Sequence, residues 1–186
     1  GRAQMPAPTL AQRVLVVQPQ INTARARSHG VGEVAGAVHL ASAAHGLQAC
    51  HAAAKAQRAW RKTPAIGRAD FMRRLADALV ARKHAIGAAL ALESGKSLED
   101  ATNEAAYAAD ITRYHAEWAR RIEGEVIPSD SPSENLVLHR EPLGVVACLI
   151  PFNYPVYTLL RKIAPALITG NTVVVRPSNN TPCSAF

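Results

Sequence analysis

The sequence predicts an α/β fold in which a layer of helices precedes a strand–helix–strand unit. Two continuous apolar runs, residues 144–150 and residues 172–176, have the length and composition of buried parallel strands. A helical pattern over residues 155–168 separates them, and a strand, a helix and a strand within about 30 residues form a βαβ unit. Alanine-rich segments with helical periodicity lie upstream of this unit.

The composition is that of a globular protein. Of the 186 residues, 48% are hydrophobic and 19% are charged, and no apolar run approaches the about 20 residues of a membrane-spanning helix. The 21 basic and 14 acidic residues give a net charge of +7, but the basic residues are scattered and only 5% of the residues are aromatic. We therefore expect a solvated basic surface, and neither nucleic acid nor a membrane among the partners.

The cysteines predict a protein of the reducing cytoplasm without a metal site. Cys50, Cys148 and Cys183 are isolated, and the absence of a CxxC pair argues against both a disulfide framework and a zinc site. The seven histidines show no spacing typical of metal ligands.

The first 40 residues carry two short runs rich in β-branched side chains. The first run, residues 14–17, makes residues 1–20 a tail or an edge strand. The second run, residues 31–40, favours an edge strand or a hairpin.

Three helices are predicted after residue 40. Nine of the 20 residues in 41–60 are alanine, and Ser42 stands at the N-cap position of this first helix. A second helix runs from about residue 68 to residue 93, with an apolar stripe of Leu75, Leu79 and Ile86. A third helix covers about residues 97–121, and one packed face is expected to hold Ala105, Ala109, Tyr114 and Trp118.

Residues 124–142 return to extended structure. Two short apolar segments flank a turn rich in proline and serine at residues 128–133, and charged residues follow the second segment. This pattern predicts a partly exposed hairpin that projects from the main body.

The loops after the two parallel strands are the place to look for a site, because ligands bind outside the carboxyl ends of such strands. Residues 151–155 and residues 176–182 form these loops and are expected at the same edge of the sheet. Asn153, between two prolines, offers a rigid amide donor that suits a developing oxyanion, an interaction that contributes about 3–4 kcal/mol. The alternative is an Asx turn that only organises the loop.

The other loop residues leave similar alternatives open. Arg176 suits a phosphate, a ribose or a surface carboxylate, while Ser178, Asn179 and Thr181 suit either a ligand or a turn. No GxGxxG fingerprint occurs in the βαβ unit. No nucleophile is evident, since Cys148 lies inside an apolar strand and no acid or histidine flanks Cys183 in the sequence.

Four motifs follow one another along the chain: ESGK at 93–96, LGVVACLIPFNYP at 143–155, KIAPALITGNTVVVRPS at 162–178 and TP at 181–182. Their order and spacing resemble those of the NAD(P)+-dependent aldehyde dehydrogenase superfamily. The resemblance runs from about residue 21 to residue 186 and corresponds to the N-terminal part, well under half, of such an enzyme. Residues 124–168 look most like the lactaldehyde and glycolaldehyde dehydrogenases.

The resemblance implies the N-terminal part of an aldehyde-dehydrogenase-like Rossmann-type cofactor domain. Residues 21–123 would be its helical part and residues 143–186 its first βαβ unit. Residues 124–142 would be the oligomerisation hairpin that joins subunits into a homo-oligomer, a dimer or a tetramer.

The resemblance also implies roles for residues of the two loops. Asn153 would be the catalytic oxyanion-hole amide that polarises the carbonyl of a small-molecule aldehyde. The residues that would bind the cofactor are Ile150, Pro151 and Phe152 on the nicotinamide-ribose side, and Arg176, Ser178 and Asn179 against the adenosine ribose.

Two departures from the family pattern bear on the choice between NAD and NADP. Arg176 stands where the family normally has lysine, and Asn179 stands where it commonly has a glutamate that binds the ribose hydroxyls. A neutral asparagine removes the repulsion of a 2′-phosphate and an arginine suits phosphate, so we expect NADP+ to be tolerated.

The implied activity is the oxidation of an aldehyde to a carboxylic acid through a cysteine thiohemiacetal. The catalytic cysteine and the general-base glutamate of the family lie beyond the point where this sequence ends. The 186 residues alone are therefore expected to be inactive. The alternative is a non-catalytic oligomerisation or interaction module derived from that family.

Overall fold

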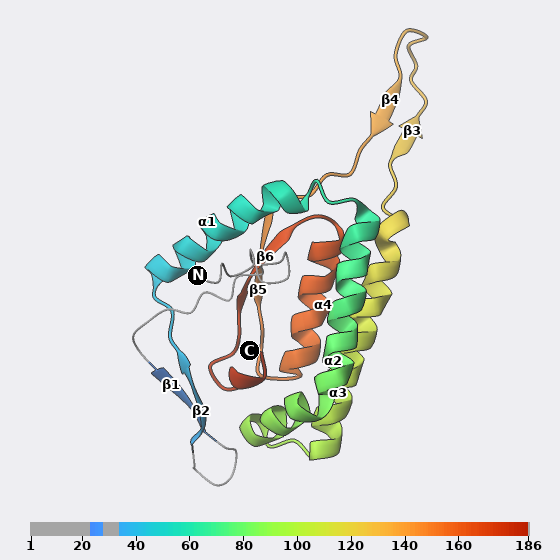
Figure 1. Ribbon diagram of the computed structural model, residues 1–186. Coiled ribbons are helices and arrows are strands. Elements are labelled where there is room, and N and C mark those ends of the chain that lie inside the picture. The colour runs from blue at the N-terminus through green and yellow to red at the C-terminus, as the bar shows by residue number, and fades with distance from the viewer. Residues whose placement is uncertain (1–22, 28–33, 186) are drawn as a thin grey trace, which may run out of the picture.

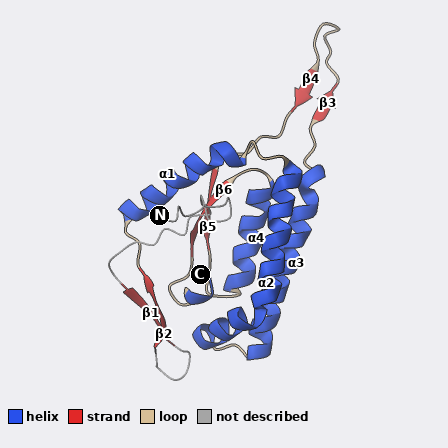
Figure 2. Ribbon diagram, viewed as in Figure 1, coloured by secondary structure: helices blue, strands red, loops and turns tan. Residues whose placement is uncertain are grey.

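The computed structural model describes residues 23–27 and 34–185 of the chain. The expected tail or edge strand of residues 1–20 lies outside these ranges. The helices and strands are, in chain order, β1 (Thr23–Arg27), β2 (Val34–His39), α1 (Ala43–Trp60), α2 (Ala65–Ser94), α3 (Leu98–Ala116), β3 (Glu125–Ile127), β4 (Leu136–Leu138), β5 (Val145–Leu149), α4 (Pro155–Ile168) and β6 (Thr172–Arg176). Helices α2, α3 and α4 lie side by side, and β5 and β6 pack against both α4 and α1, which confirms the α/β class (Figure 1, Figure 2).

Local sequence signals set the helix ends. Ser42 caps α1 as predicted, because its hydroxyl accepts a hydrogen bond from the His45 amide at 3.3 Å. In return His45 Nδ1 accepts one from the Ser42 amide at 3.1 Å, which completes a capping box. Helix α2 begins at Ala65, before the predicted residue 68, since Pro64 at its N-cap needs no partner for an N–H group. It ends at Gly95, whose φ of 73° reverses the chain.

Small residues make the contact between α3 and its neighbours. The fully buried alanines of α3 are Ala101, Ala105, Ala108, Ala109 and Ala116. Two of the four residues predicted for the packed face are therefore confirmed. Tyr114 and Trp118 are not, since they are 50% and 39% exposed. The close helix contact admits only small side chains, and the two rings lie against each other outside it, with centroids 6.4 Å apart.

The end of the third helix also differs from the prediction. Helix α3 stops at Ala116, and Glu117–Arg120 continue as a single 3₁₀ turn. The predicted stripe of α2 is confirmed, because all three of its residues pack against the apolar cluster between α2, α3 and α4: Leu75, Leu79 and Ile86.

The βαβ unit has the predicted form. Strands β5 and β6 pair in parallel, from Val145 opposite Thr172 to Leu149 opposite Arg176, and α4 connects them. The predicted burial of the two strands is only partial, since Leu149 is 62% exposed while Cys148 is 2% exposed. Each of the two strands has one strand neighbour among the described residues, so part of their apolar surface stays open.

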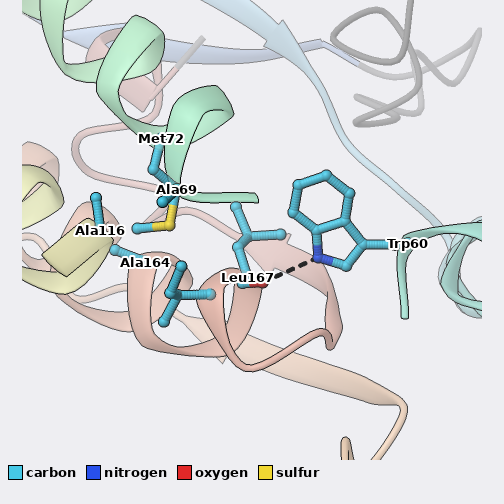
Figure 3. Close-up of a cluster of buried hydrophobic side chains, with 7 residues drawn as sticks. Trp60, Ala69, Met72, Ala116, Ala164 and Leu167 are labelled. Atoms are coloured by element: carbon cyan, nitrogen blue, oxygen red, sulfur yellow. Dashed lines mark hydrogen bonds between the residues drawn. The ribbon is translucent and has the colours of Figure 1, made fainter. Parts of the chain in front are cut away.

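A buried cluster joins α1 and α2 to the C-terminal end of α4 (Figure 3). Met72 of α2 lies among Ala69, Ala116 and Ala164, and the Trp60 ring covers the side of Leu167. The indole Nε1 of Trp60 donates a hydrogen bond to the Leu167 carbonyl at 2.9 Å. This bond satisfies a buried donor, at a carbonyl near the end of α4 that also accepts from the Gly170 amide at 3.0 Å.

Two β-hairpins complete the described chain. Strands β1 and β2 pair antiparallel, so the run at residues 31–40 contributes to a hairpin. Strands β3 and β4 also pair antiparallel, with Val126 opposite Val137, and all six of their residues are exposed. This second hairpin extends away from the helices, as the sequence predicted (Figure 1).

Candidate functional site

The two loops predicted to carry the site leave the same edge of the parallel pair. The last ladder bond runs from the Ile150 amide to the Arg176 carbonyl at 3.0 Å. Beyond it, residues 151–154 turn into α4, and residues 177–182 lead toward a 3₁₀ turn at Cys183–Ala185. This arrangement confirms the expected juxtaposition of the loops.

The first loop presents Asn153 to a cleft of about 880 Å³. The cleft lies between α3 and α4 and is lined by Tyr107, Asp110, Ile111, Tyr114, Pro151, Asn153, Tyr154, Tyr157, Thr158 and Arg161. Phe152, 60% exposed, and Pro151 are also at the surface, whereas Ile150 is buried. The side chain of Ile150 is therefore the least accessible of the three residues expected on the nicotinamide side.

The geometry argues against the Asx-turn alternative for Asn153. An Asx turn needs the backbone N–H group two residues on, and that residue is Pro155, which has none. The next two N–H groups, of Val156 and Tyr157, are already bonded to another side chain. Among the described residues Asn153 has no side-chain hydrogen bond, and it is exposed and lines the cleft.

The side chain that binds the amides of Val156 and Tyr157 is Glu104 of α3, a residue that the sequence analysis missed. Its Oε1 accepts hydrogen bonds from the amides of Val156 at 2.9 Å and Tyr157 at 3.2 Å, and its Oε2 accepts one from Lys96 Nζ at 2.5 Å. Glu104 is fully buried. A lone acid among the alanines on one face of α3 was the available signal, because a buried carboxylate requires partners.

Glu104 also determines what α4 can bind. A helix N-terminus attracts anions, and in many dinucleotide-binding βαβ units it holds the pyrophosphate. Here the carboxylate of Glu104 already fills that position. The N-terminus of α4 is thus a structural contact, which agrees with the missing glycine fingerprint.

The second loop is anchored by another buried acid, Glu93 of α2. Its two carboxylate oxygens accept hydrogen bonds from the amides of Cys183 at 2.7 Å and Ser184 at 3.0 Å. Sequence reasoning noted Glu93 only as part of a motif. Glu93 and Glu104 together hold the far ends of both loops against the helical layer.

The predicted cofactor residues of the second loop lie close together. Arg176 Nη2 donates to Asn179 Oδ1 at 3.3 Å, and both side chains are exposed. The Ser178 hydroxyl accepts a hydrogen bond from the Asn180 amide at 3.1 Å, so this residue serves the turn. Thr181 is buried, and its hydroxyl has no partner within the described residues.

Two of the three cysteines are shielded from solvent, Cys148 fully and Cys183 in part. Cys148 is buried as predicted, and burial raises the pKa of its thiol, although the charge of Lys162 acts in the opposite sense. Burial also raises the pKa of Cys183, and the charge and hydrogen bond of Glu93 raise it further. The sequence showed no acid beside Cys183 because Glu93 is 90 residues away along the chain.

Metal ions and membranes are the other binding partners that side-chain clusters or long helices would indicate. No group of three or more histidine, cysteine, aspartate or glutamate side chains in 23–27 and 34–185 is placed to hold a metal ion. No helix in the described part of the chain has both the length and the apolar character needed to cross a membrane.

Comparison with known proteins identifies the family. The profile described as the aldehyde dehydrogenase family matches residues 16–186. Lactaldehyde dehydrogenase of Escherichia coli is 45% identical over 139 residues, which cover 75% of this chain and 29% of that protein. A crystal structure of lactaldehyde dehydrogenase from Escherichia coli superposes with a TM-score of 0.87 at 39% identity, over 89% of this chain and 35% of that one.

Two further crystal structures show the same likeness. NADP-dependent glyceraldehyde-3-phosphate dehydrogenase from Bacillus halodurans, complexed with NADP, gives a TM-score of 0.82 at 35% identity, over 88% of this chain and 35% of that one. An NAD-dependent benzaldehyde dehydrogenase from Corynebacterium glutamicum gives a TM-score of 0.84 at 32% identity, over 88% of this chain and 36% of that one. The chain spans about a third of the length of these relatives. Since the profile covers nearly all of this sequence and the superpositions most of it, the chain belongs to the aldehyde dehydrogenase family.

Proposed function

We propose that the protein to which this chain belongs oxidises an aldehyde to a carboxylic acid with NAD+ or NADP+, and that Asn153 stabilises the oxyanion. The observation that carries this proposal is the exposed amide of Asn153 in the lining of the cleft. An amide held in place before the reaction stabilises negative charge on a carbonyl oxygen without a reorganisation cost. Family membership supplies the reaction class.

The cofactor site of this proposal is the edge where the two loops meet. Phe152 and Pro151 offer exposed apolar surface for a nicotinamide ribose, and Arg176 with Asn179 offers polar groups for an adenosine ribose. These groups fit a dinucleotide laid across the carboxyl ends of β5 and β6. When bound, the nicotinamide would accept the hydride of the aldehyde.

We infer that the attacking thiol is neither Cys148 nor Cys183. The pKa values of Cys148 and Cys183 are raised, which lowers the fraction of thiolate in both. Neither residue lines the cleft of Asn153. We infer that residues other than these form the thiohemiacetal, and that the 186-residue chain by itself forms no NAD(P)H with an aldehyde.

The test compares Asn153→Ala with wild type in the product of the complete reading frame that encodes this chain. We expect kcat for aldehyde oxidation to fall by about 10²–10³-fold, with little change in the KM for the cofactor. Asn180→Ala, a matched change at an exposed asparagine of the second loop, should leave both constants unchanged. A kcat of Asn153→Ala within about twofold of wild type would contradict the assigned role.

The same proposal includes self-association through the β3–β4 hairpin. Val126 is 81% exposed and its cross-strand neighbour Val137 is 52% exposed. In the described part of the chain both outer edges of this hairpin also lack a strand neighbour. Exposed apolar side chains and open strand edges are typical of a surface that pairs with another chain. We infer that the partner is a second copy of this protein.

A further inference from the structure

The residue after Asn153 has an unfavourable backbone conformation. Tyr154 has φ 50° and ψ 54°, and within the described residues it is the only non-glycine residue with positive φ. Side chains make this left-handed region costly, and a following proline restricts the residue further. Such a conformation persists only where neighbouring groups hold it.

Two side chains from outside the loop hold this turn. Lys96 Nζ lies 3.6 Å from the centroid of the Tyr154 ring, which is the geometry of a cation–π contact. The same ammonium donates to Glu104 Oε2 at 2.5 Å. Glu104 in turn fixes the amides of Val156 and Tyr157 with its other oxygen. The turn is therefore held on its ring side and at the start of α4.

Fold stability alone does not account for a buried ion pair between Lys96 and Glu104. Glu104 is fully buried and the Lys96 side chain is only 21% exposed, so both ions have lost most of their water. Buried ion pairs often contribute no more stability than apolar residues of the same volume. Here the two ions also contact the residues next to Asn153, because Lys96 lies over the Tyr154 ring and Glu104 binds the amides of Val156 and Tyr157.

We propose that Lys96 and Glu104 are positioning residues that hold Tyr154 in its left-handed turn and thereby direct the Asn153 amide into the cleft. The inference rests on the proposed function for its catalytic consequence. It deepens that function by assigning a task to two residues that touch neither the expected substrate nor the expected cofactor.

The first test is a double-mutant cycle in the full-length protein. Lys96→Met keeps the apolar stem and removes the ammonium, and we expect kcat to fall about tenfold with an unchanged cofactor KM. In the Asn153→Ala background the same change should have almost no further effect, because the amide that it positions is gone. Asp77→Asn removes an exposed ion pair between α2 and α3 and should leave kcat unchanged.

The second test does not depend on activity. Amide hydrogen exchange of the same full-length proteins should show faster exchange at Val156 and Tyr157 in Lys96→Met and Glu104→Gln than in wild type. The Thr172 amide, bonded to the Gly144 carbonyl at the other end of the sheet, should not change and reports intact folding.

Each result bears on the inference. A wild-type protein that oxidises no aldehyde would overturn the proposed function. The exchange rates of the Val156 and Tyr157 amides would still test whether Lys96 and Glu104 stabilise the turn at Tyr154. A loss of kcat in Lys96→Met that is equally large with and without Asn153 would overturn the positioning role, as would unchanged exchange at Val156 and Tyr157.

Discussion

Buried charges at the two ends of α4 decide how the crossover helix sits. Glu104 meets the first amides of α4, and Arg68 Nε donates to the Ile168 carbonyl at 2.9 Å. A negative group at the N-terminus and a positive group at the C-terminus both match the helix dipole. Burial lowers the pKa of Arg68, but an arginine remains protonated at neutral pH. These contacts fix the loop that carries Asn153 and the start of β6.

Asn179 offers a test of cofactor choice at the scale of one side chain. Arg176 Nη2 lies 3.3 Å from Asn179 Oδ1, so Asn179→Glu would place a carboxylate beside the Arg176 guanidinium. It would neutralise the cation and repel a 2′-phosphate, so the KM for NADP+ should rise about tenfold more than the KM for NAD+. Steady-state kinetics of the full-length protein with both cofactors measure this. Asn180→Ala serves as the control, and equal changes in both KM values would contradict the assignment.

The thiols provide a second test at the residue scale. Raised pKa values mean that at a given pH Cys148 and Cys183 carry less thiolate than a free thiol, and alkylation proceeds through the thiolate. In the folded protein, exposed Cys50 should react first, Cys183 next and Cys148 last. The rate at Cys183 should still be rising above about pH 9. Peptide mapping by mass spectrometry measures the alkylation rate of each cysteine. Unfolding in urea should make the three rates equal. Faster reaction of folded Cys183 than of Cys50 at neutral pH would contradict the effect of Glu93.

At the scale of elements, the contact of α2 with α3 depends on a glycine, Gly87, which has no side chain to hold the helices apart. A Cβ atom on Gly87 would lie 2.5 Å from Thr102 Oγ1 and 2.9 Å from the Thr102 backbone. The backbone cannot give way as the end of a flexible side chain would. Gly87 therefore sets the distance between the two helices, together with the buried alanines of α3.

Gly87→Ala should destabilise the protein by about 1–3 kcal/mol through overpacking, although alanine is the better helix former. Gly46→Ala in α1 is the matched control, because a Cβ there meets nothing within 4 Å. That change should stabilise by about 0.5–1 kcal/mol. Urea denaturation of both variants measures the difference, and a neutral or stabilising Gly87→Ala would contradict the close approach.

At the scale of the whole molecule, the projecting hairpin is one place where large apolar side chains are exposed: Val126, Ile127, Leu136, Val137 and Leu138. Replacing Val126 by Asp and Val137 by Lys puts an opposite-charge pair on facing positions and keeps the hairpin register. We expect the mass in solution to fall from that of an oligomer to that of a monomer. Light scattering on the size-exclusion peak measures it. Leu47→Lys, at a 58% exposed position of α1, should keep the wild-type mass. A double variant that keeps the oligomer mass would exclude the hairpin as the interface.

Much of the fold could be predicted because local patterns carry it. The bounds of α4 and β6, the cap at Ser42 and the hairpin at residues 124–142 depend on periodicity, capping residues and turn residues that act over a few positions. The packed face of α3 was only half predicted. An aromatic residue on a periodic stripe is a good core candidate in general, but Tyr114 and Trp118 are displaced by alanines that allow a closer helix contact.

The sequence by itself determined the α/β class, the order of the elements, the family and the two loops at one edge of the sheet. Only the tertiary structure decided which side chains hold those loops. Glu104 meets Val156 across 52 residues, Glu93 meets Cys183 across 90, and Arg68 meets Ile168 across 100. Periodicity and propensity describe a chain over a few turns or strands, whereas the partner of a buried charge depends on which helices pack together. For that reason the sequence indicated Asn153, and the packing of α3 against α4 decided which cleft this residue lines.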